Sequence, residues 1–481
     1  MQRIQITRYR RTRGYSFHHD VADGALTMNA WLVSTLILSL AWAWPAEAAR
    51  YTLGQLVEKV TRESPSIVAA RAAVAVRQAQ VLEQQLRWLP DGEAGATLYG
   101  APAVRYDVPD STATTDIVDL TRSVPDKSLF DRAPIHAVRI TLGADLRQPL
   151  YTFGKIAAAI GSARGGLAYD SGNLTRDELD VGLTAVRIYT QIRVARIALD
   201  SVEQTLQQMR DWEKQIDVAL DGKNPLRFGE TDLARMRLSI VNTEIAKLDY
   251  ERNFVAAREA LRQLTNDPSA DTDEADFAYT GSSQEAEVAR DIARRPEVLA
   301  SRAGLDYYGK WHHLHLSFAL PDVGFVSSAW GGYVPNTDPN NPQVWTLAGG
   351  YVGLVLREPL DFGPKLMRWM QIGHEERMQR ARFAMGYGYW QLELLKARLD
   401  FREAYTRLAK TQKAEGVTHG WYAAVHSNLA LGLATDGREL VDVMMSWCGY
   451  RVQHAQAVAD TLIALATLQR MSGEPILGAL R

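Results

Sequence analysis

The densest group of side chains with metal-binding chemistry is the run His312-His313-Leu314-His315. On a helix, His312 and His315 would share one face, and two histidines three or four residues apart commonly form half of a zinc site. No aspartate or glutamate follows until Asp322, and the segment corresponds to an ordinary helix in the first half of the chain. The sequence therefore predicts no metal site.

No other group of residues suggests catalysis. The single cysteine, Cys448, excludes an intrachain disulfide framework and a cysteine-built zinc site, and we expect it to be a small buried helix residue. The chain has no glycine-rich phosphate loop, no Ser/His/Asp arrangement at motif spacing and no convincing pair of catalytic carboxylates. We therefore predict that the protein is not an enzyme and needs no cofactor.

Charge and composition narrow the class of partner. The 54 lysines and arginines nearly balance the 56 acidic residues, which gives a formal net charge of −2. Nucleic acid as a main partner would call for a basic patch or stripe. A hydrophobic content of 46% is too high for a disordered chain. We therefore expect a folded protein that does not bind nucleic acid.

Residues 1–49 are expected to be an export signal. Trp31 to Trp44 is an almost uninterrupted apolar run, and it ends in Pro-Ala-Glu-Ala-Ala, a cleavage site of the A-x-A type. About 14 apolar residues are too few to span a bilayer as a helix. Met28 is an alternative start, which would place residues 1–27 upstream of the true start. We expect the mature chain to begin near Arg50, outside the cytoplasm.

Beyond the signal, the chain contains the same pattern twice. SPSIVAARA at 64–72 is echoed by RPEVLASRA at 295–303, and LRQPL at 146–150 is echoed by LREPL at 356–360. This spacing is far longer than that of solenoid repeats, so we predict a duplicated half-molecule.

Each repeat is expected to contain a helix, two strands, a long helix and a further helix. In the first repeat, residues 50–280, strands are predicted at 94–104 and 138–148 and long helices at 154–221 and 231–265. In the second repeat, residues 281–475, strands are predicted at 323–333 and 347–358 and long helices at 364–432 and 438–471. Residues 138–147 alternate apolar and polar side chains, which is typical of a strand with one apolar face. Prolines are predicted to mark the strand–helix transitions, at Pro90, Pro149, Pro321 and Pro359.

The long helices carry only a narrow apolar stripe. In 231–265 the spacing of the apolar residues is that of a coiled-coil seam, formed by Leu238, Val241, Ile245, Leu248 and Val255. Such helices suit a wall surrounded by water. Four strands, in contrast, cannot close a barrel alone, and open edges in lipid leave backbone groups unsatisfied. Three chains would supply twelve strands, an even number within the range of bacterial barrels.

Three segments give a specific resemblance. LRQPLYTFGK at 146–155 resembles the strand-to-helix passage of the TolC family of outer-membrane channels, and FGETDL at 228–233 and GLATDGRELVDV at 432–443 resemble its two helix tips. The resemblance implies an α+β membrane protein that forms a homotrimer with a shared twelve-stranded β-barrel and a long α-helical coiled-coil tunnel in the periplasm. It also implies contact with outer-membrane lipid, a periplasmic adaptor protein and an inner-membrane transporter.

The implied function is a passive conduit of a tripartite efflux pump or a type I secretion system in the outer membrane. The family's tip residues map here onto Gly222, Phe228, Gly229, Thr231, Asp232, Gly432, Asp436 and Gly437, which we expect to contact the adaptor. Family members often place acidic residues on the helix that enters the second tip, whereas residues 427–431 contain none.

Asp436 and Glu439 are therefore the candidate gate residues, since a threefold ring of carboxylates would attract cations. The alternative role for both is to stabilise a helix N-terminus. The competing function is a periplasmic coiled-coil scaffold or adaptor without a pore. The cargo, whether drug, metal ion, protein or lipid, stays open.

Overall fold

A computed structural model describes residues 50–101, 137–221, 228–273, 277–281, 292–335, 344–357, 361–431 and 436–476. The chain divides into two units, residues 1–49 and 50–481, and all described residues belong to the second. The expected export signal therefore lies outside the described residues, as do Gly222, Gly432 and Pro359.

The described part opens with two short helices. Thr52 caps α2 (Leu53–Glu63) in a capping box with Gln55, which satisfies backbone donors at the helix start. α3 (Pro65–Leu86) has proline at its first position, where the missing N–H costs nothing. Strands β1 (Arg50–Tyr51) and β4 (Asp271–Thr272) pair in parallel beside them.

The remaining strands form one antiparallel sheet in the order β2-β3-β5-β6. The strands are β2 (Asp91–Ala101), β3 (Ala137–Tyr151), β5 (Asp322–Pro335) and β6 (Val344–Arg357). All four overlap the predicted strands, with ends that differ by a few residues. The edges β2 and β6 have no strand partner on their outer sides within the described part of the chain.

One face of this sheet is apolar and uncovered. Leu98 of β2, Leu142 of β3 and Leu354 of β6 lie on that face and are 70%, 59% and 73% exposed. The other face carries polar side chains such as Thr97 and Asp145, which the alternation of the strands places opposite. The alternation thus produces an apolar surface with no layer of the described chain packed on it.

The passage from β3 to the next helix does not occur at Pro149, contrary to the prediction. Pro149 lies inside β3, at a register shift against β5. The chain turns instead at Phe153 and Gly154, whose φ angles of 48° and 84° are left-handed. Phe153 is strained in this region, whereas glycine adopts it freely. Pro90 and Pro321 directly precede β2 and β5.

Lys155 fixes this turn to the second half of the chain. Its ammonium group donates to the carbonyl of Leu320 at 2.7 Å and lies 2.8 Å from the carboxylate of Asp322, at the start of β5. Its side chain is only 11% exposed. The two partners satisfy a charge that would otherwise be costly to bury.

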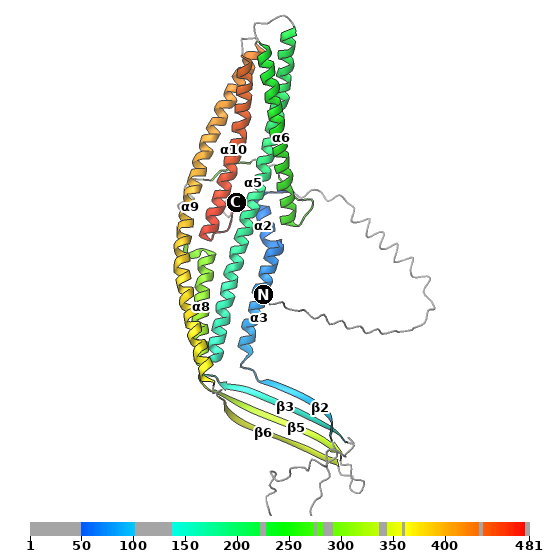
Figure 1. The fold of residues 1–481 in the computed structure, drawn as a ribbon, viewed down its shortest axis with the longest axis vertical. Coiled ribbons are helices and arrows are strands. Elements are labelled where there is room, and N and C mark those ends of the chain that lie inside the picture. Colours follow the sequence, from blue (N-terminus) through cyan, green and yellow to red (C-terminus); the bar gives the residue numbers. More distant parts are fainter. Residues whose placement is uncertain are drawn as a thin grey trace, which may run out of the picture. The chain divides into compact units, whose positions relative to one another are not determined.

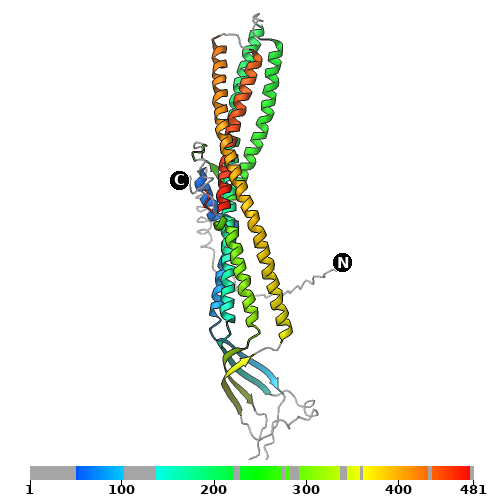
Figure 2. The ribbon, with the colours of Figure 1, turned by 90° about the vertical axis from the view of Figure 1, so that its left-hand side faces the viewer.

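The long helices run side by side away from the sheet (Figures 1 and 2). They are α5 (Lys155–Asp221), α6 (Glu230–Thr265), α8 (Pro296–Ser317), α9 (Phe362–Ala430) and α10 (Gly437–Ser472), with the short η1 (Ile292–Arg294) before α8. α5 has 67 residues and is therefore about 100 Å long. α9 is continuous, without a break inside it.

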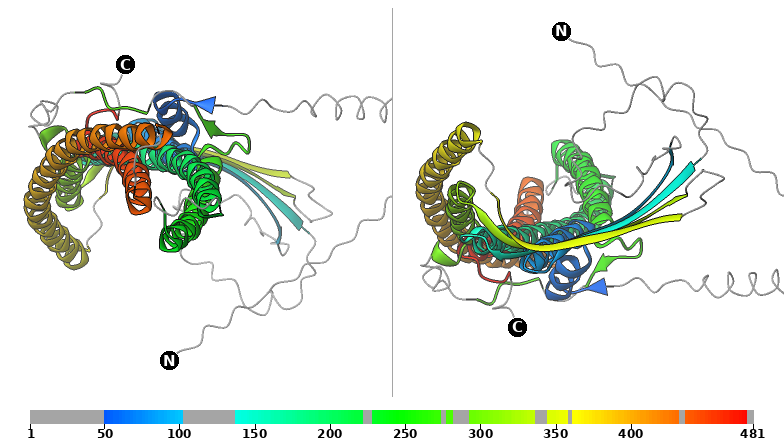
Figure 3. Two further views of the ribbon diagram at one scale, coloured as in Figure 1. Left: turned by 90° about the horizontal axis from the view of Figure 1, so that it is seen from above. Right: turned by 90° about the horizontal axis from the view of Figure 1, so that it is seen from below.

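The helices form a curved layer (Figure 3). Near the sheet the neighbours run in the order α3, α5, α8, α9, and farther away in the order α6, α5, α10, α9. Small residues let α5 and α8 approach closely: a Cβ on Gly165 would lie 2.9 Å from the backbone of Tyr307. No helix of the described residues has the length and apolarity needed to cross a membrane.

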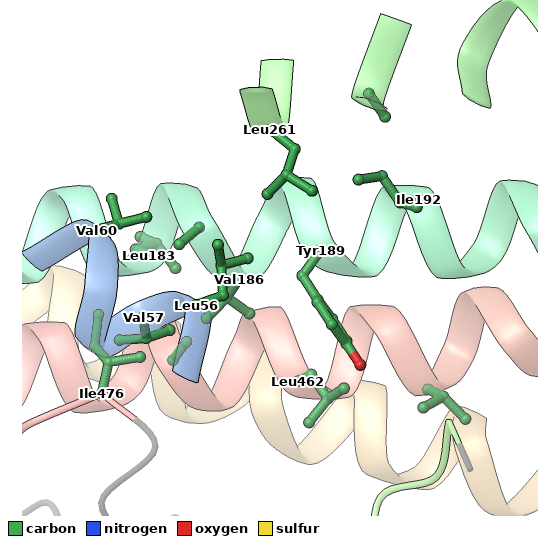
Figure 4. Close-up of a cluster of buried hydrophobic side chains, with 14 of the residues drawn as sticks. Leu56, Val57, Val60, Leu183, Val186, Tyr189, Ile192, Leu261, Leu462 and Ile476 are labelled. Atoms are coloured by element: carbon green, nitrogen blue, oxygen red, sulfur yellow. The ribbon is translucent and has the colours of Figure 1, made fainter. Parts of the chain in front are cut away.

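The main hydrophobic core lies where α2 packs on the long helices (Figure 4). Leu56 and Val60 of α2 contact the part of α5 around Val186, and Leu261 of α6 and Leu462 of α10 complete the cluster. α2 is strongly amphipathic, as a helix packed on one side of a layer must be. Its buried side carries Leu56, Val57 and Val60.

A partly buried ion network joins α5, α8, α9 and α10. Arg470 of α10 makes a bidentate contact with Asp180 of α5, at 2.6 and 3.2 Å, and lies 2.6 Å from Glu297 of α8. Arg295 contacts the same Glu297 at 2.9 Å and Glu393 of α9 at 2.6 Å. Four helices from both halves of the chain are thereby linked through two arginines.

Burial by itself would raise the pKa of Glu297, but the hydrogen bond from Arg295 and the charge of Arg470 outweigh it, so the net pKa is lowered. A lowered pKa in the folded state means that the ionised carboxylate stabilises the fold. That stability is complete above the unfolded pKa of about 4.3 and is lost as the pH falls through the folded pKa.

Glu297→Gln is expected to destabilise the protein by about 3 kcal/mol at neutral pH, because it leaves two buried guanidinium groups without a shared carboxylate. Thermal unfolding followed by circular dichroism should show this loss, and the difference from the wild type should shrink below about pH 4. Glu259→Gln, at an exposed pair with Arg262, is the matched control and should change little. An equal effect of both substitutions would contradict the role of the network.

Candidate functional site at the helix tips

The two predicted tips lie at the same end of the helical layer, away from the sheet (Figure 1). The start of α6 meets the start of α10 there: a Cβ built on Gly437 would lie 2.6 Å from the Cβ of Asp232. Only glycine fits at 437, because a contact that short forces the backbone or the partner to move. The structure therefore brings Asp232 and Gly437 into direct contact.

Asp232 serves the N-terminus of its own helix as well. Its carboxylate accepts the backbone N–H of Gly229 at 3.0 Å, and Gly229 is the N-cap of α6. The carboxylate also lies close to the N-terminus of α10, because Gly437, which contacts Asp232, is the first residue of that helix. Negative charge is favourable at both helix starts, so Asp232 stabilises the junction of the two helices.

The candidate gate residues have local partners. Asp436 is the N-cap of α10 and accepts the backbone N–H of Arg438 at 3.0 Å. Glu439 accepts the indole N–H of Trp421 of α9 at 3.3 Å. Both carboxylates are exposed, as is Thr231. A capping role for Asp436 leaves one of its oxygens available to solvent.

Phe228 differs from the other predicted tip residues because it is buried. It belongs to a hydrophobic cluster with Trp212 of α5, Met236 of α6 and Leu440 of α10. Phe228 therefore anchors the chain just before α6, next to the N-cap Gly229.

Stacked aromatic rings extend this cluster between α9 and α10. Tyr422 stacks on Trp447 with ring centroids 4.8 Å apart, and Trp212 lies 6.4 Å from Tyr422. Cys448 is buried beside them, as expected, and burial raises the pKa of its thiol. A buried thiol of raised pKa is a poor nucleophile.

The histidine run lies on α8, near the opposite end of the helices. His312 is 3.2 Å from Glu376 of α9 and stacks on Trp369. His315 is buried against Trp311, and burial lowers its pKa. Within the described residues, no three His, Cys, Asp or Glu side chains are placed to hold one metal ion.

Sequence reasoning missed the Asp232–Gly437 contact and the Tyr422–Trp447 stack. One signal was available for the stack, because Tyr422 and Trp447 are almost equally far from the second tip. In an antiparallel helix pair such residues meet. No comparable signal links Asp232 with Gly437, since the two tips are far apart in the sequence.

No protein-family model matches the chain, and no match occurs among curated protein sequences. Solved structures do match. The outer-membrane channel OprN superposes with a TM-score of 0.67 over 88% of this chain and 90% of that one, at 16% identity. The chain has the TolC fold.

Two further structures support the TolC fold. The outer-membrane protein VceC of Vibrio cholerae matches at a TM-score of 0.65 and 16% identity, over 88% of this chain and 96% of that one. The open state of the outer-membrane channel MtrE of Neisseria gonorrhoeae matches at a TM-score of 0.66 and 14% identity. That match covers 88% of this chain and 89% of that one. Because each match covers 88% of this chain, the likeness includes both the described sheet and the described long helices.

Gly437→Ala is expected to destabilise the tip by about 1–3 kcal/mol, because the added methyl group overlaps Asp232. In an Asp232→Gly background, which lacks the clashing Cβ, Gly437→Ala should cost little relative to Asp232→Gly alone. Thermal unfolding of the single and double variants measures both effects.

The matched control is Gly420→Ala on α9, where an added Cβ meets nothing within 4 Å. Alanine should be neutral or stabilising there by up to about 1 kcal/mol, since it is the better helix former. Destabilisation by Gly420→Ala as large as that by Gly437→Ala would refute the contact as the cause.

Proposed function

We propose that this protein is the outer-membrane channel of a tripartite efflux pump or a type I secretion system, acting as a passive conduit. The proposal is supported by the TolC fold, which this chain shares with channels such as OprN and MtrE. Passive transport through a conduit involves no covalent step, so no catalytic residue is proposed.

The observation that carries the proposal is the uncovered apolar face of the four-stranded sheet. Large exposed apolar surfaces mark binding to a partner or to a membrane. The two free edges add unpaired backbone groups, which are tolerated in lipid only when the sheet closes on itself. Three copies of a four-stranded sheet give a closed barrel of twelve strands.

The helices carry matching evidence for a homotrimer. The predicted seam residues of α6 are all exposed, and Leu238, Ile245 and Val255 are 62%, 56% and 65% exposed. α9 lies at the opposite edge of the layer. On it, exposed apolar residues recur every seven positions, at Met378, Met385, Leu392 and Leu399. Neighbouring copies on the two sides would cover these stripes, since each stripe lies at an edge of the helical layer.

An exposed apolar collar surrounds the junction of sheet and helices. Its residues come from the ends of α3, β3 and α8 and the start of α9: Trp88, Leu89, Tyr151, Phe318 and Phe362. Aromatic side chains at one level are typical of a membrane–water interface. We place this collar at the periplasmic leaflet of the outer membrane, which puts the sheet in the bilayer and the helices in the periplasm.

The tip is then the end of the conduit that faces the inner membrane. We assign contact with a periplasmic adaptor, and through it with an inner-membrane transporter, to the surface around Gly229, Thr231 and Asp436. Asp436 and Glu439 are the candidates for a carboxylate ring. The two similar halves, α3 to α6 and α8 to α10 with their strands, fit a pseudo-sixfold wall built from three chains.

The competing function, a periplasmic scaffold without a pore, explains the helices but not the sheet. A scaffold surrounded by water would have to expose the apolar face around Leu142 and Leu354 to solvent. Nothing in the described part of the chain covers that face.

The purified mature protein should require detergent, run as a trimer and form ion-conducting pores in planar bilayers. Replacing both Asp436 and Glu439 with alanine should reduce the cation preference of the current if the two form a ring. An unchanged preference would remove them as gate residues while leaving the conduit intact. A water-soluble monomer without conductance would instead support the scaffold.

Ile245→Glu is expected to weaken the trimer, because it places a charge within the apolar stripe of α6 that a neighbouring copy covers. Analytical ultracentrifugation in detergent should show a shift from trimer toward smaller species. Asn253→Glu adds the same charge to the same helix outside the stripe and should leave the trimer unchanged. Equal effects of both would argue against this stripe as an interface.

A further inference from the structure

A cavity of about 420 Å³ lies among the helices near the sheet. Its lining comes from α3, α5, α8 and α9, so both halves of the chain contribute. The volume is within the range of small-molecule sites. A passive conduit needs no such site, which makes the chemistry of the lining informative.

Five aromatic residues line the cavity: Tyr169, Tyr307, Tyr308, Phe383 and Trp390. Tyr307 and Tyr308 meet edge to face at 5.3 Å, and Phe383 and Trp390 do so at 6.2 Å. These contacts hold the rings in fixed orientations. Burial raises the pKa of Tyr307, so its hydroxyl stays neutral and adds no negative charge to the wall.

Two glycines keep the cavity open. A Cβ on Gly304 would lie 3.4 Å from the ring of Tyr169, and one on Gly166 would lie 3.8 Å from the ring of Tyr307. Larger side chains at these positions would occupy the space beside the rings. A flat ligand is therefore favoured over a bulky one.

The charges of the lining leave one guanidinium uncompensated. Arg77 pairs with Asp170 at 2.7 Å, and these two charges cancel. Arg382 also lines the cavity, and no carboxylate of the described residues forms an ion pair with it. Gln379 lies one helical turn before Arg382 and adds an amide donor to the lining. The site thus combines flat apolar walls with a net positive charge.

We propose that this cavity binds a planar aromatic anion, with its ring between the aromatic walls and its carboxylate or sulfonate on Arg382. Guanidinium groups bind carboxylates through paired N–H donors, which gives both charge and geometry. Aromatic faces attract cations as well, but the positive charge of Arg382 opposes a cationic ligand. The proposal is independent of the conduit function.

The test uses three probes with one ring system: 2-naphthoate, 2-naphthalenemethanol and 2-naphthylmethylammonium. Isothermal titration of the purified full-length protein in detergent should show that naphthoate binds at least tenfold more tightly than the other two. Arg382→Gln should abolish that preference. Arg382 is exposed, so the substitution leaves the fold intact and decides the matter even if other variants do not fold.

Gly304→Leu, which fills the cavity, should abolish binding of all three probes. Arg380→Gln is the matched control: Arg380 is two residues from Arg382 but pairs with Glu376 at 2.6 Å and does not line the cavity. It should bind naphthoate as the wild type does. Equal affinities for the three probes, or naphthoate binding unaffected by Arg382→Gln, would overturn the proposal. Conductance of the same preparation tests the conduit separately.

Discussion

The whole structure depends on a sheet that the chain cannot complete by itself. Among the described residues, the four antiparallel strands end in two unpaired edges, and one face of the sheet presents leucines and valines to its surroundings. Backbone edges and apolar faces are each costly in water, and an open edge is costly in lipid as well. Closure with further copies of the chain, inside a bilayer, satisfies both requirements at once.

The long helices, like the sheet, leave apolar surface that the described part of the chain does not cover. They are charged over most of their surface and bury only narrow stripes against each other, so they need neighbours at both edges of the layer. Inside one chain, the partly buried network around Glu297 and the turn held by Lys155 connect the two halves. These contacts fix the position of the sheet relative to the helices that leave it.

Much of this architecture was predictable from local patterns. The alternation in 138–147 predicts β3, and the proline-free stretch from 154 predicts α5, because period and breakers are properties of the sequence alone. Pro149 misled the prediction: at a register shift a proline is tolerated within a strand, and the turn itself uses Phe153 and Gly154. The apolar spacing of α6 was visible in the sequence, but the exposure of those residues in the described part of the chain was not.

Contacts between segments that are distant in the sequence could not be predicted from local sequence patterns. Asp232 and Gly437 are ordinary helix-start residues until the fold brings the two starts together. Arg382 is likewise one of many arginines, and its lack of a carboxylate partner among the described residues emerges only from the packing of α8 and α9. Local sequence thus predicts the helices and strands, whereas the residues that form a site depend on how those helices and strands pack.

Disulfide trapping between the two sheet edges tests the central claim most directly. A cysteine at Thr97 of β2 would be combined, in a Cys448→Ala background, with one cysteine at a time at positions 349, 351, 353 and 355 of β6, on the same face of the sheet. The account predicts that one register gives covalent dimers and trimers and nothing larger after oxidation in the membrane. If every pair yields only uncrosslinked single chains, the sheet does not close between copies.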